Sequence, residues 1–439
     1  MASLDILATL RPEHGVVQGV SIMPPEPPDH LLWTVAVDIG ALAVSRVRGL
    51  DAADFPLHLV GACGPSRIDA LVRGCGEAVE RFALLNPAFP PAMTARAAEL
   101  EDAALHCWNE GLAAPDAALA CLSWYPGRRL RTEEVVHVPA PLVDYPPTDE
   151  QAALLFDPSP SGAAAGHGFR HALYNALLET VERDAVLSAW ATQATLPRVD
   201  VDQALTVSPA SVATRRLGEL IAAARKACLE PALAQIPTAV PGLECVICAI
   251  VDVSSGEPLA AVGCRISCSL IDSLGGALRE ALQVRSVLIG IRRHYADRAS
   301  PTIVTNDLDR ARFWSGARAA AALEAWIATW PFVDVKPGVA MGDVNISVPQ
   351  SGRDIDALVA ALVVDGADPI VVDLTGRLPQ PLRDMGWAAV KVIAPGYQPL
   401  VMDERKTWSW RPARLAALAR RLGATQPSPM VCCVPHPLI

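Results

Sequence analysis

The sequence predicts an α/β (α+β) fold in which long helices pack on mixed β-sheets. Three observations support it. Short β-branched runs alternate with longer helical segments, the helical segments are amphipathic or rich in alanine, and no Gly/Ser-rich linker interrupts the alternation. We therefore expect one integrated catalytic domain over residues 1–439, with an N-terminal half at about 1–150 and a C-terminal half at about 151–439.

The expected elements follow from local composition. Runs rich in β-branched residues predict strands at residues 32–37, 135–138, 245–251, 259–262, 370–374 and 388–393. Apolar periodicity or a high alanine content predicts helices at residues 66–82, 90–130, 169–190, 274–291 and 317–328. Ser66 is the expected N-cap of the first helix. The Pro-rich stretch 125–149 reads as a connection between the two halves.

Composition excludes several classes of protein. The formal charge of −10 and the lack of a long Lys/Arg run argue against a nucleic-acid-binding protein. The loose group Arg411, Arg414, Arg420 and Arg421 falls at helical spacing and is interpreted as a solvated helix face. Eleven cysteines without paired CxxC clusters indicate reduced thiols, and neither a signal peptide nor a run of about 18 apolar residues occurs. We expect a soluble cytoplasmic protein without membrane partners.

One short pattern, ExxER, occurs twice. The copies are Glu77-Ala-Val-Glu80-Arg81 and Glu179-Thr-Val-Glu182-Arg183, which begin 102 positions apart in helical contexts. Residues three apart share a helix face, so each copy presents two carboxylates beside an arginine. Such acids repel one another unless a cation or a proton lies between them, and hard oxygen ligands suit Mg²⁺. An exposed Glu/Arg face is the alternative interpretation.

Two weaker signals accompany these motifs. Glu280-Ala-Leu-Gln283-Val-Arg285 places an acid and an amide three apart on another apolar helix. The Gly-rich run 161–168 precedes a predicted helix, where backbone N–H groups could meet an anion, although a plain turn fits as well. The sequence contains neither a Walker A pattern nor a GxGxxG after a strand.

In this order, the motifs resemble the YcaO superfamily. The most specific block, 161–190, is similar to the family's SNGLAAG…LLEVIERDA…W segment. The block 263–290 is similar to its AxxEAxQSR segment, and residues 371–375 and 392–396 resemble its VVDLT and VKVIVPG strands. The matches extend from about 62 to 400. The resemblance implies a YcaO-like fold with the nucleotide site between pseudo-repeated helices.

The same resemblance implies ATP and Mg²⁺ as cofactors. It assigns Mg²⁺ to the acids of both ExxER motifs, namely Glu77, Glu80, Glu179 and Glu182. It assigns nucleotide contacts to Arg81, Ser161, Arg183, Glu280, Gln283 and Arg285. Two departures bear on phosphate contact: Ala62-Cys63-Gly64 stands where the family often has a GKG turn, and Ser161 replaces an asparagine.

The activity implied by the resemblance is amide activation on a ribosomally made precursor peptide. A nucleophile attacks a backbone amide carbonyl, ATP phosphorylates the resulting oxyanion, and phosphate leaves. A Cys, Ser or Thr side chain as nucleophile gives a thiazoline or oxazoline, whereas external sulfide gives a thioamide. The C-terminus resembles the Pro-rich end of azoline-forming members at Pro435 and Pro437, with Ile439 in place of the last proline, so these three are candidate catalytic residues. A frayed tail is the alternative.

The resemblance also implies partners. Azoline-forming members generally work with an E1-like leader-binding protein, and the segment before residue 62 is too short for a fused one, so we expect a separate subunit. A flavin-dependent dehydrogenase and a homodimer within the complex are further expectations. Three functions stay open: a cyclodehydratase, which we favour, a thioamide-forming enzyme with a sulfur-delivery partner, and a non-catalytic peptide-binding scaffold.

Overall fold

The computed structural model describes residues 6–40, 58–85, 93–147, 150–254, 257–333, 354–422 and 434–439. Its strands are β1 Gly19–Met23, β2 Trp33–Asp38, β3 Leu59–Gly64, β4 Met93–Arg96, β5 Cys121–Arg129, β6 Val135–Pro139, β7 Ala163–His167, β8 Arg198–Val199, β9 Ala232–Ile236, β10 Glu244–Asp252, β11 Leu259–Ser267, β12 Phe332–Val333, β13 Ile370–Asp373 and β14 Trp387–Ile393. Its helices are α2 Arg67–Leu85, α3 Ala97–Leu100, α4 Glu150–Leu155, α5 Phe169–Ala191, α6 Val201–Val207, α7 Val212–Lys226, α8 Leu270–His294, α9 Asp307–Trp314, α10 Ala317–Ile327, α11 Ile355–Val364, α12 Gln380–Asp384 and α13 Pro412–Arg421.

The described strands form three sheets. One has the order β1-β2-β3, a second has the order β11-β10-β9-β8-β12, and the third has the order β4-β5-β13-β14-β7 with β6 paired to β5. Most neighbours are antiparallel, while β12 and β8 are parallel. Mixed sheets covered by long helices agree with the predicted fold class.

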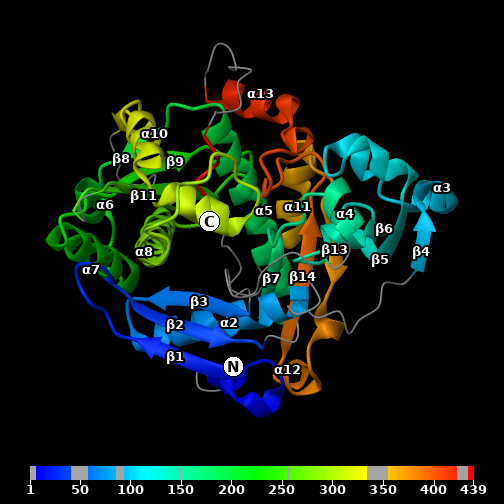
Figure 1. Ribbon diagram of the computed structural model, residues 1–439, viewed down its shortest axis with the longest axis horizontal. Helices are drawn as coiled ribbons and strands as arrows, with labels where there is room; N and C mark the ends of the chain where they lie inside the picture. Colours follow the sequence, from blue (N-terminus) through cyan, green and yellow to red (C-terminus); the bar gives the residue numbers. More distant parts are fainter. Residues whose placement is uncertain are drawn as a thin grey trace.

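The third sheet separates two hydrophobic cores, and its side chains explain why. On β14, Val390 and Val392 pack into the core that contains α5, whereas Ala389 and Ile393 pack into the core that contains α2. Because side chains alternate along a strand, Lys391 lies on the same face of β14 as Ala389 and Ile393. Figure 1 shows β13 and β14 running through the middle of the molecule, with α5 beside them and α2 behind the small sheet β1-β2-β3.

Helix α8 lies directly on β11. A Cβ added at Gly263 would stand 2.2 Å from the Ala281 nitrogen, so no larger residue fits between strand and helix here. This close approach fixes the depth at which α8 presents Glu280 to the rest of the molecule.

Several sequence predictions are confirmed by the structure. The predicted helices at 66–82, 169–190, 274–291 and 317–328 correspond to α2, α5, α8 and α10, and all six predicted strand runs lie in or overlap strands. Ser66 caps α2, since its hydroxyl accepts a hydrogen bond from the Asp69 N–H at 3.2 Å. Within the described residues, no helix is long and apolar enough to cross a membrane.

The prediction of a helical segment over 90–130 is wrong. The described residues 93–130 form strands β4 and β5 with only short helical turns between them. Gly111, in a left-handed conformation with φ +65°, and Pro115 break the alanine-rich stretch, while Leu122 and Trp124 alternate into the core as strand residues. Residues 125–149, interpreted as a connection, contribute β6 and part of β5.

The solvated face assigned to the arginines of α13 is also wrong. Arg414 is buried, and its guanidinium group donates to both carboxylate oxygens of Asp184 at 2.8 and 2.6 Å and to Asp365 at 2.6 Å. Arg411 pairs with Glu110 at 3.0 Å, and Arg421 pairs with Asp365. Arg420 alone of the four is exposed. The group ties α13 to α5 instead of facing water.

The run 161–168 precedes a helix as predicted, although most of it is a strand. Residues 163–167 are strand β7, which pairs with β14, and α5 begins only at Phe169. Glu179 lies ten residues further, about 15 Å along the helix at 1.5 Å per residue. The start of α5 is therefore about 15 Å from the acids that the helix carries.

Candidate functional site

The first ExxER motif is half-buried on α2. Arg81 Nε lies 3.0 Å from Glu77 Oε1 and 3.9 Å from Glu80 Oε1, so one guanidinium group serves both acids. Burial, and then repulsion from Glu77 and Glu179, raises the pKa of Glu80 well above its usual value. A bound cation would stabilise the ionised form of this carboxyl group, which burial and the neighbouring acids disfavour.

The second motif repeats this arrangement on α5. Arg183 Nε lies 3.6 Å from Glu179 Oε1, and a terminal nitrogen of Arg183 lies 3.1 Å from Glu182 Oε1. Burial raises the pKa of Glu179, opposed by Arg183 and reinforced by Glu182. Glu182 itself is buried, with 6% of its surface exposed.

The two motifs converge. Glu179 on α5 is close enough to raise the pKa of Glu80 on α2, and Arg81 on α2 acts in turn on Glu179. The structure therefore brings acids from both copies, 102 residues apart in sequence, into one electrostatic cluster. An exposed Glu/Arg face, the alternative considered above, does not describe it.

Lys391 is a member of this cluster that the sequence did not reveal. It is buried on β14, and its Nζ donates hydrogen bonds to the carbonyl oxygens of Ser159 at 2.7 Å and Ser161 at 2.6 Å. Burial lowers the pKa of Lys391 to about 8, although Glu179 and Glu80 act to raise it. A lysine in the middle of the apolar run 388–393 was the available signal.

Ser161, predicted to contact nucleotide, lies at the edge of this cluster. The next residue, Gly162, has φ +81°, and a Cβ there would stand 2.3 Å from the Val392 carbonyl oxygen, so the turn requires glycine. A pocket of the described structure adjoins the turn. Among the residues that line it are Asp157, Ser161, Gly162, Thr180, Arg183 and Lys391.

The third motif joins the cluster through Glu280. Its Oε2 accepts a hydrogen bond from the Cys264 N–H at 3.0 Å. Burial raises the pKa of Glu280 to about 7, opposed by Arg183 and reinforced by Glu182. Gln283, one turn further on α8, donates to the Gly61 carbonyl at 3.3 Å and lies 3.0 Å from the Cys63 thiol.

Cys264 is a second residue that the sequence analysis missed. Its thiol donates to Glu182 at 3.3 Å, and Arg183 donates to its sulfur at 3.0 Å. Burial raises the pKa of this thiol well above its usual value, so it stays protonated. A cysteine in a β-strand core carries no local signal that distinguishes it from a core filler.

Arg285 is not brought together with these residues. It has 1% of its surface exposed and is 2.7 Å from the Asp252 carboxylate, while its remaining donors reach the carbonyl oxygens of Pro28 and Asp29 at 3.0 and 2.8 Å. These contacts make it an internal brace of α8. The nucleotide contact predicted for Arg285 therefore has no support in this arrangement.

The C-terminal tail is docked, contrary to the frayed-tail alternative. His436, Pro437 and Leu438 are buried, and Ile439 is 37% exposed. Arg310 donates to the His436 carbonyl at 3.0 Å, and the His436 Nε2 lies 2.5 Å from the Val401 carbonyl. Figure 1 shows the carboxyl end near the centre of the view, by α8 and α5.

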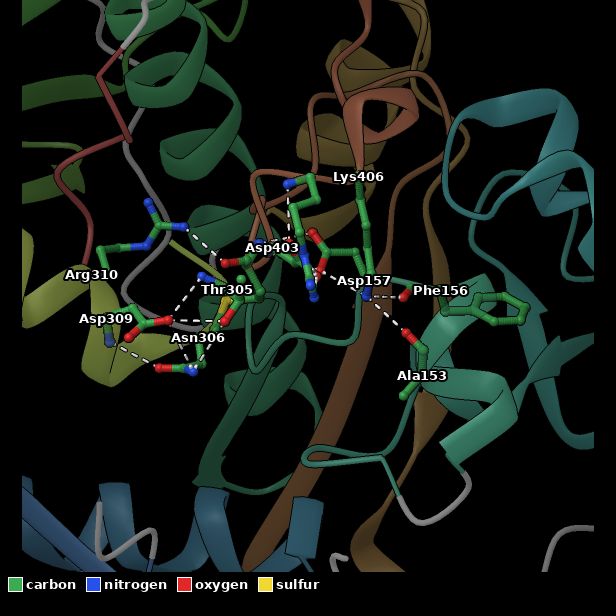
Figure 2. Close-up of polar contacts among 11 residues, drawn as sticks. Ala153, Phe156, Asp157, Thr305, Asn306, Asp309, Arg310, Asp403 and Lys406 are labelled. Carbon is green, nitrogen blue, oxygen red and sulfur yellow. Dashed lines mark hydrogen bonds and ion pairs between the residues drawn. The ribbon is translucent and has the colours of Figure 1, made fainter. Parts of the chain in front are cut away.

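A polar network supports this docking (Figure 2). Arg310 also binds Glu404 at 3.0 Å and the carbonyl oxygens of Val401 and Met402 at 2.7 and 3.1 Å. The Asp157 carboxylate accepts from the Met402 N–H at 2.8 Å. The segment 401–404 thereby connects the tail to the loop that lines the pocket.

A magnesium site is compatible with this set of residues, although it is not preformed. Among the described residues, no three acidic, His or Cys side chains already gather as a metal-binding group. The acids turn instead toward Arg81 and Arg183. Mg²⁺ is usually held by one or two carboxylates together with phosphates, so a full protein cage is not required.

Comparisons with known proteins show the family and the fold of this chain. The family model described as YcaO cyclodehydratase, ATP- and Mg²⁺-binding, matches residues 61–398. A heterocyclase in complex with substrate and cofactor has a TM-score of 0.69 and 18% identity, with 99% of this chain aligned to 57% of that one. The chain thus spans little more than half of that heterocyclase. Among curated proteins, none matches the sequence.

Two further solved structures share the fold. YcaO from Methanopyrus kandleri bound with AMPPCP and Mg²⁺ has a TM-score of 0.60 and 19% identity, and the match covers 92% of this chain and 94% of that one. The E. coli microcin synthetase McbBCD complex with pro-MccB17 bound has a chain with a TM-score of 0.59 and 12% identity, and the match covers 86% and 88%. At these identities the likeness concerns the fold.

Proposed function

This chain belongs to the YcaO family, and we propose that it is an ATP- and Mg²⁺-dependent cyclodehydratase. Its substrate would be a ribosomally made precursor peptide in which Cys, Ser or Thr becomes a thiazoline or oxazoline. The observation that carries the proposal is the convergence of Glu80 on α2 and Glu179 on α5 beside the buried Lys391. The acids of this partly buried cluster repel one another, and a bound Mg²⁺ would relieve that repulsion further than Arg81 and Arg183 do.

Magnesium would be held by acids of both helices, chosen from Glu77, Glu80, Glu179 and Glu182. When bound, ATP supplies a phosphoryl group that converts the amide oxygen into a better leaving group. Arg81 and Arg183, which now neutralise the acids, would be free to meet phosphate oxygens once the metal takes over that neutralisation. Ser161 and Gln283 border the same region.

Two residues of the site are suited to proton transfer. Glu280, with a pKa raised to about 7, is present in both protonation states near neutral pH. Lys391, with a pKa lowered to about 8, can also give up a proton at mild pH. The incoming Cys, Ser or Thr must lose a proton on ring closure, and either group could receive it directly or through a water molecule.

The docked tail supports the azoline-forming branch. The tail that carries Pro435, Pro437 and Ile439 is held through the His436 carbonyl, which accepts from Arg310, and Arg310 also binds segment 401–404. That segment contacts the pocket loop through Asp157. We propose that the tail positions the peptide at the pocket.

We also propose protein partners for this chain. One of the structures that share the fold is the microcin synthetase McbBCD complex with pro-MccB17 bound. For this chain we propose a separate E1-like leader-binding protein, a flavin-dependent dehydrogenase that would oxidise azolines, and a homodimer within the complex. Light scattering of the purified chain alone and with the leader-binding protein tests the assembly.

The reaction is tested by mass spectrometry of a candidate precursor peptide incubated with this chain, its partner, ATP and Mg²⁺. A loss of one water per modified residue supports the cyclodehydratase. Exchange of oxygen for sulfur identifies the thioamide-forming alternative, and an unmodified peptide despite ATP binding identifies the scaffold. Glu179→Gln is the loss-of-function variant, and Glu219→Gln, at an exposed ion pair on α7, is the matched control.

A further inference from the structure

The pocket that adjoins the Ser161 turn has an apolar side that the proposed reaction does not use. The pocket encloses about 650 Å³, part of it open to solvent. Loops and short helical turns contribute the apolar side chains that we name the apolar wall: Leu112, Leu142, Pro158, Pro399, Leu400 and Trp408. Distant segments meet here, since a Cβ added at Gly111 would stand 3.2 Å from the Trp408 carbonyl oxygen. Leu142, Leu400 and Trp408 are only half-buried, so apolar surface is left for a ligand to cover.

The charged side chains of the pocket lining are already engaged. Among the described residues that line the pocket, these are Asp157, Arg183 and Lys391. The Asp157 carboxylate accepts hydrogen bonds from two backbone N–H groups, at 2.8 and 3.2 Å. Arg183 faces the acids of its own motif, and Lys391 donates to two carbonyl oxygens of the turn. Away from the acid cluster, a charged ligand would therefore meet no unpaired opposite charge in this lining.

Most of the neutral polar side chains of the lining are engaged as well. The hydroxyls of Thr180 and Tyr397 each donate a hydrogen bond at 2.9 Å, and the Gln398 amide donates two, at 2.9 and 3.0 Å. Within the described part of the chain, the Ser159 hydroxyl and the Trp408 indole N–H have no hydrogen-bond partner. Ligand sites of this composition, apolar with a few free polar groups, take uncharged and largely apolar groups.

We propose that the apolar wall binds an apolar side chain of the precursor peptide, on a residue next to the one that is cyclised. The pocket borders the acid cluster through Arg183 and Lys391, so a side chain inside it belongs to a residue close to the reacting amide. Consecutive Cα atoms lie about 3.8 Å apart, so the immediate neighbours of the cyclised residue are the first within reach. This inference rests on the proposed function and specifies which peptides its site prefers.

The test compares three acetylated and amidated peptides that share one cysteine: GGFCFGG, GGGCGGG and GGDCDGG. Calorimetry measures their binding to the full chain in the presence of MgADP. The phenylalanine peptide should bind about tenfold more tightly than the glycine peptide, because it buries apolar surface against the wall. The aspartate peptide should bind no more tightly than the glycine peptide, because the charges of the lining are already paired.

Three substitutions of leucine by glutamine locate the effect. Leu142→Gln and Leu400→Gln place an amide in the apolar wall and should reduce the preference for the phenylalanine peptide to less than about threefold. Leu119→Gln is the matched control, because Leu119 is 80% exposed and lies outside the pocket, and it should keep the preference. The affinity of the two wall variants for MgATP should change less than about twofold, since the wall is not assigned to the nucleotide.

Several results would overturn the inference. Equal binding of the phenylalanine and glycine peptides to the wild type is one, and tighter binding of the aspartate peptide is another; neither comparison needs a variant to fold. A preference that persists in both wall variants would place the apolar contact elsewhere, and weakened MgATP binding by those variants would assign the wall to the nucleotide. Failure of the wild type to bind MgATP, with the peptide preference intact, would instead count against the proposed function.

Discussion

The ion pair between Arg414 and Asp184 gives the sharpest prediction about how the site is held. Arg414→Met keeps the aliphatic stem and removes the guanidinium group, which donates to Asp184 at 2.8 and 2.6 Å and to Asp365 at 2.6 Å. The Asp184 side chain is only 4% exposed. The variant therefore leaves a buried carboxylate without its cation, beside the Glu182–Arg183 pair of α5.

The magnitude follows from that burial. Breaking a buried pair by removing one partner costs about 3–5 kcal/mol. With an unfolding entropy of about 2.1 cal/mol/K per residue, a chain of 439 residues has about 0.9 kcal/mol/K in total, so the melting temperature should fall by about 3–5 °C. The Asp184 carboxylate still accepts a hydrogen bond from the Gln398 N–H, which limits the loss.

Differential scanning calorimetry measures this change. Arg420→Met is the matched control, because Arg420 lies on the same helix and is exposed. It should shift the melting temperature by less than about 1 °C, in line with a surface cost within about 0.5 kcal/mol. Adding Asp184→Asn to Arg414→Met should recover part of the lost melting temperature, because the unpaired buried carboxylate of Asp184 is then replaced by a neutral amide. Equal melting temperatures for the two single variants would refute the reasoning.

Three further predictions concern the site. Because the pKa of Glu280 is raised to about 7 in the folded chain, its ionisation destabilises the ligand-free protein as pH rises from about 4.5 to about 7, and Glu280→Gln should flatten that part of the stability curve measured by urea unfolding in EDTA. Deleting Ile439, which is partly exposed, should abolish peptide turnover in the mass-spectrometric assay while the melting temperature stays within about 1 °C. Arg310→Met should instead lower both, because it leaves the Glu404 carboxylate and three carbonyl oxygens without their donor. Normal turnover without Ile439 would refute a catalytic tail.

The sequence was informative where the signal is local. Apolar periodicity located α2, α5 and α8, and repetition of ExxER identified the acids that converge. The repeated pattern succeeded because each copy needs only one helix to place two acids and an arginine on one face. Alanine content alone failed over 90–130, because Leu122 and Trp124 gain more from packing in a sheet than alanines gain from helix propensity.

The rest depends on contacts between distant segments. Lys391 and Cys264 look like strand residues until the fold places them beside Glu179 and Glu182. Arg285 on α8 belongs to the expected motif, yet its guanidinium group forms an ion pair with Asp252 on β10. No local pattern encodes which carboxylate an arginine will meet, so pairing of this kind had to come from the structure.

In the proposed site, acids of α2 and α5 share one magnesium–nucleotide complex. The most direct test of this sharing is calorimetric titration of the purified chain with ATP in the presence and absence of Mg²⁺, for the wild type, Glu80→Gln, Glu179→Gln and the control Glu219→Gln. We expect magnesium-dependent binding that each of the first two substitutions weakens at least about tenfold, as removal of a charged ligand should, and that the control leaves intact. ATP binding that ignores Mg²⁺, or that survives both substitutions unchanged, would contradict the account.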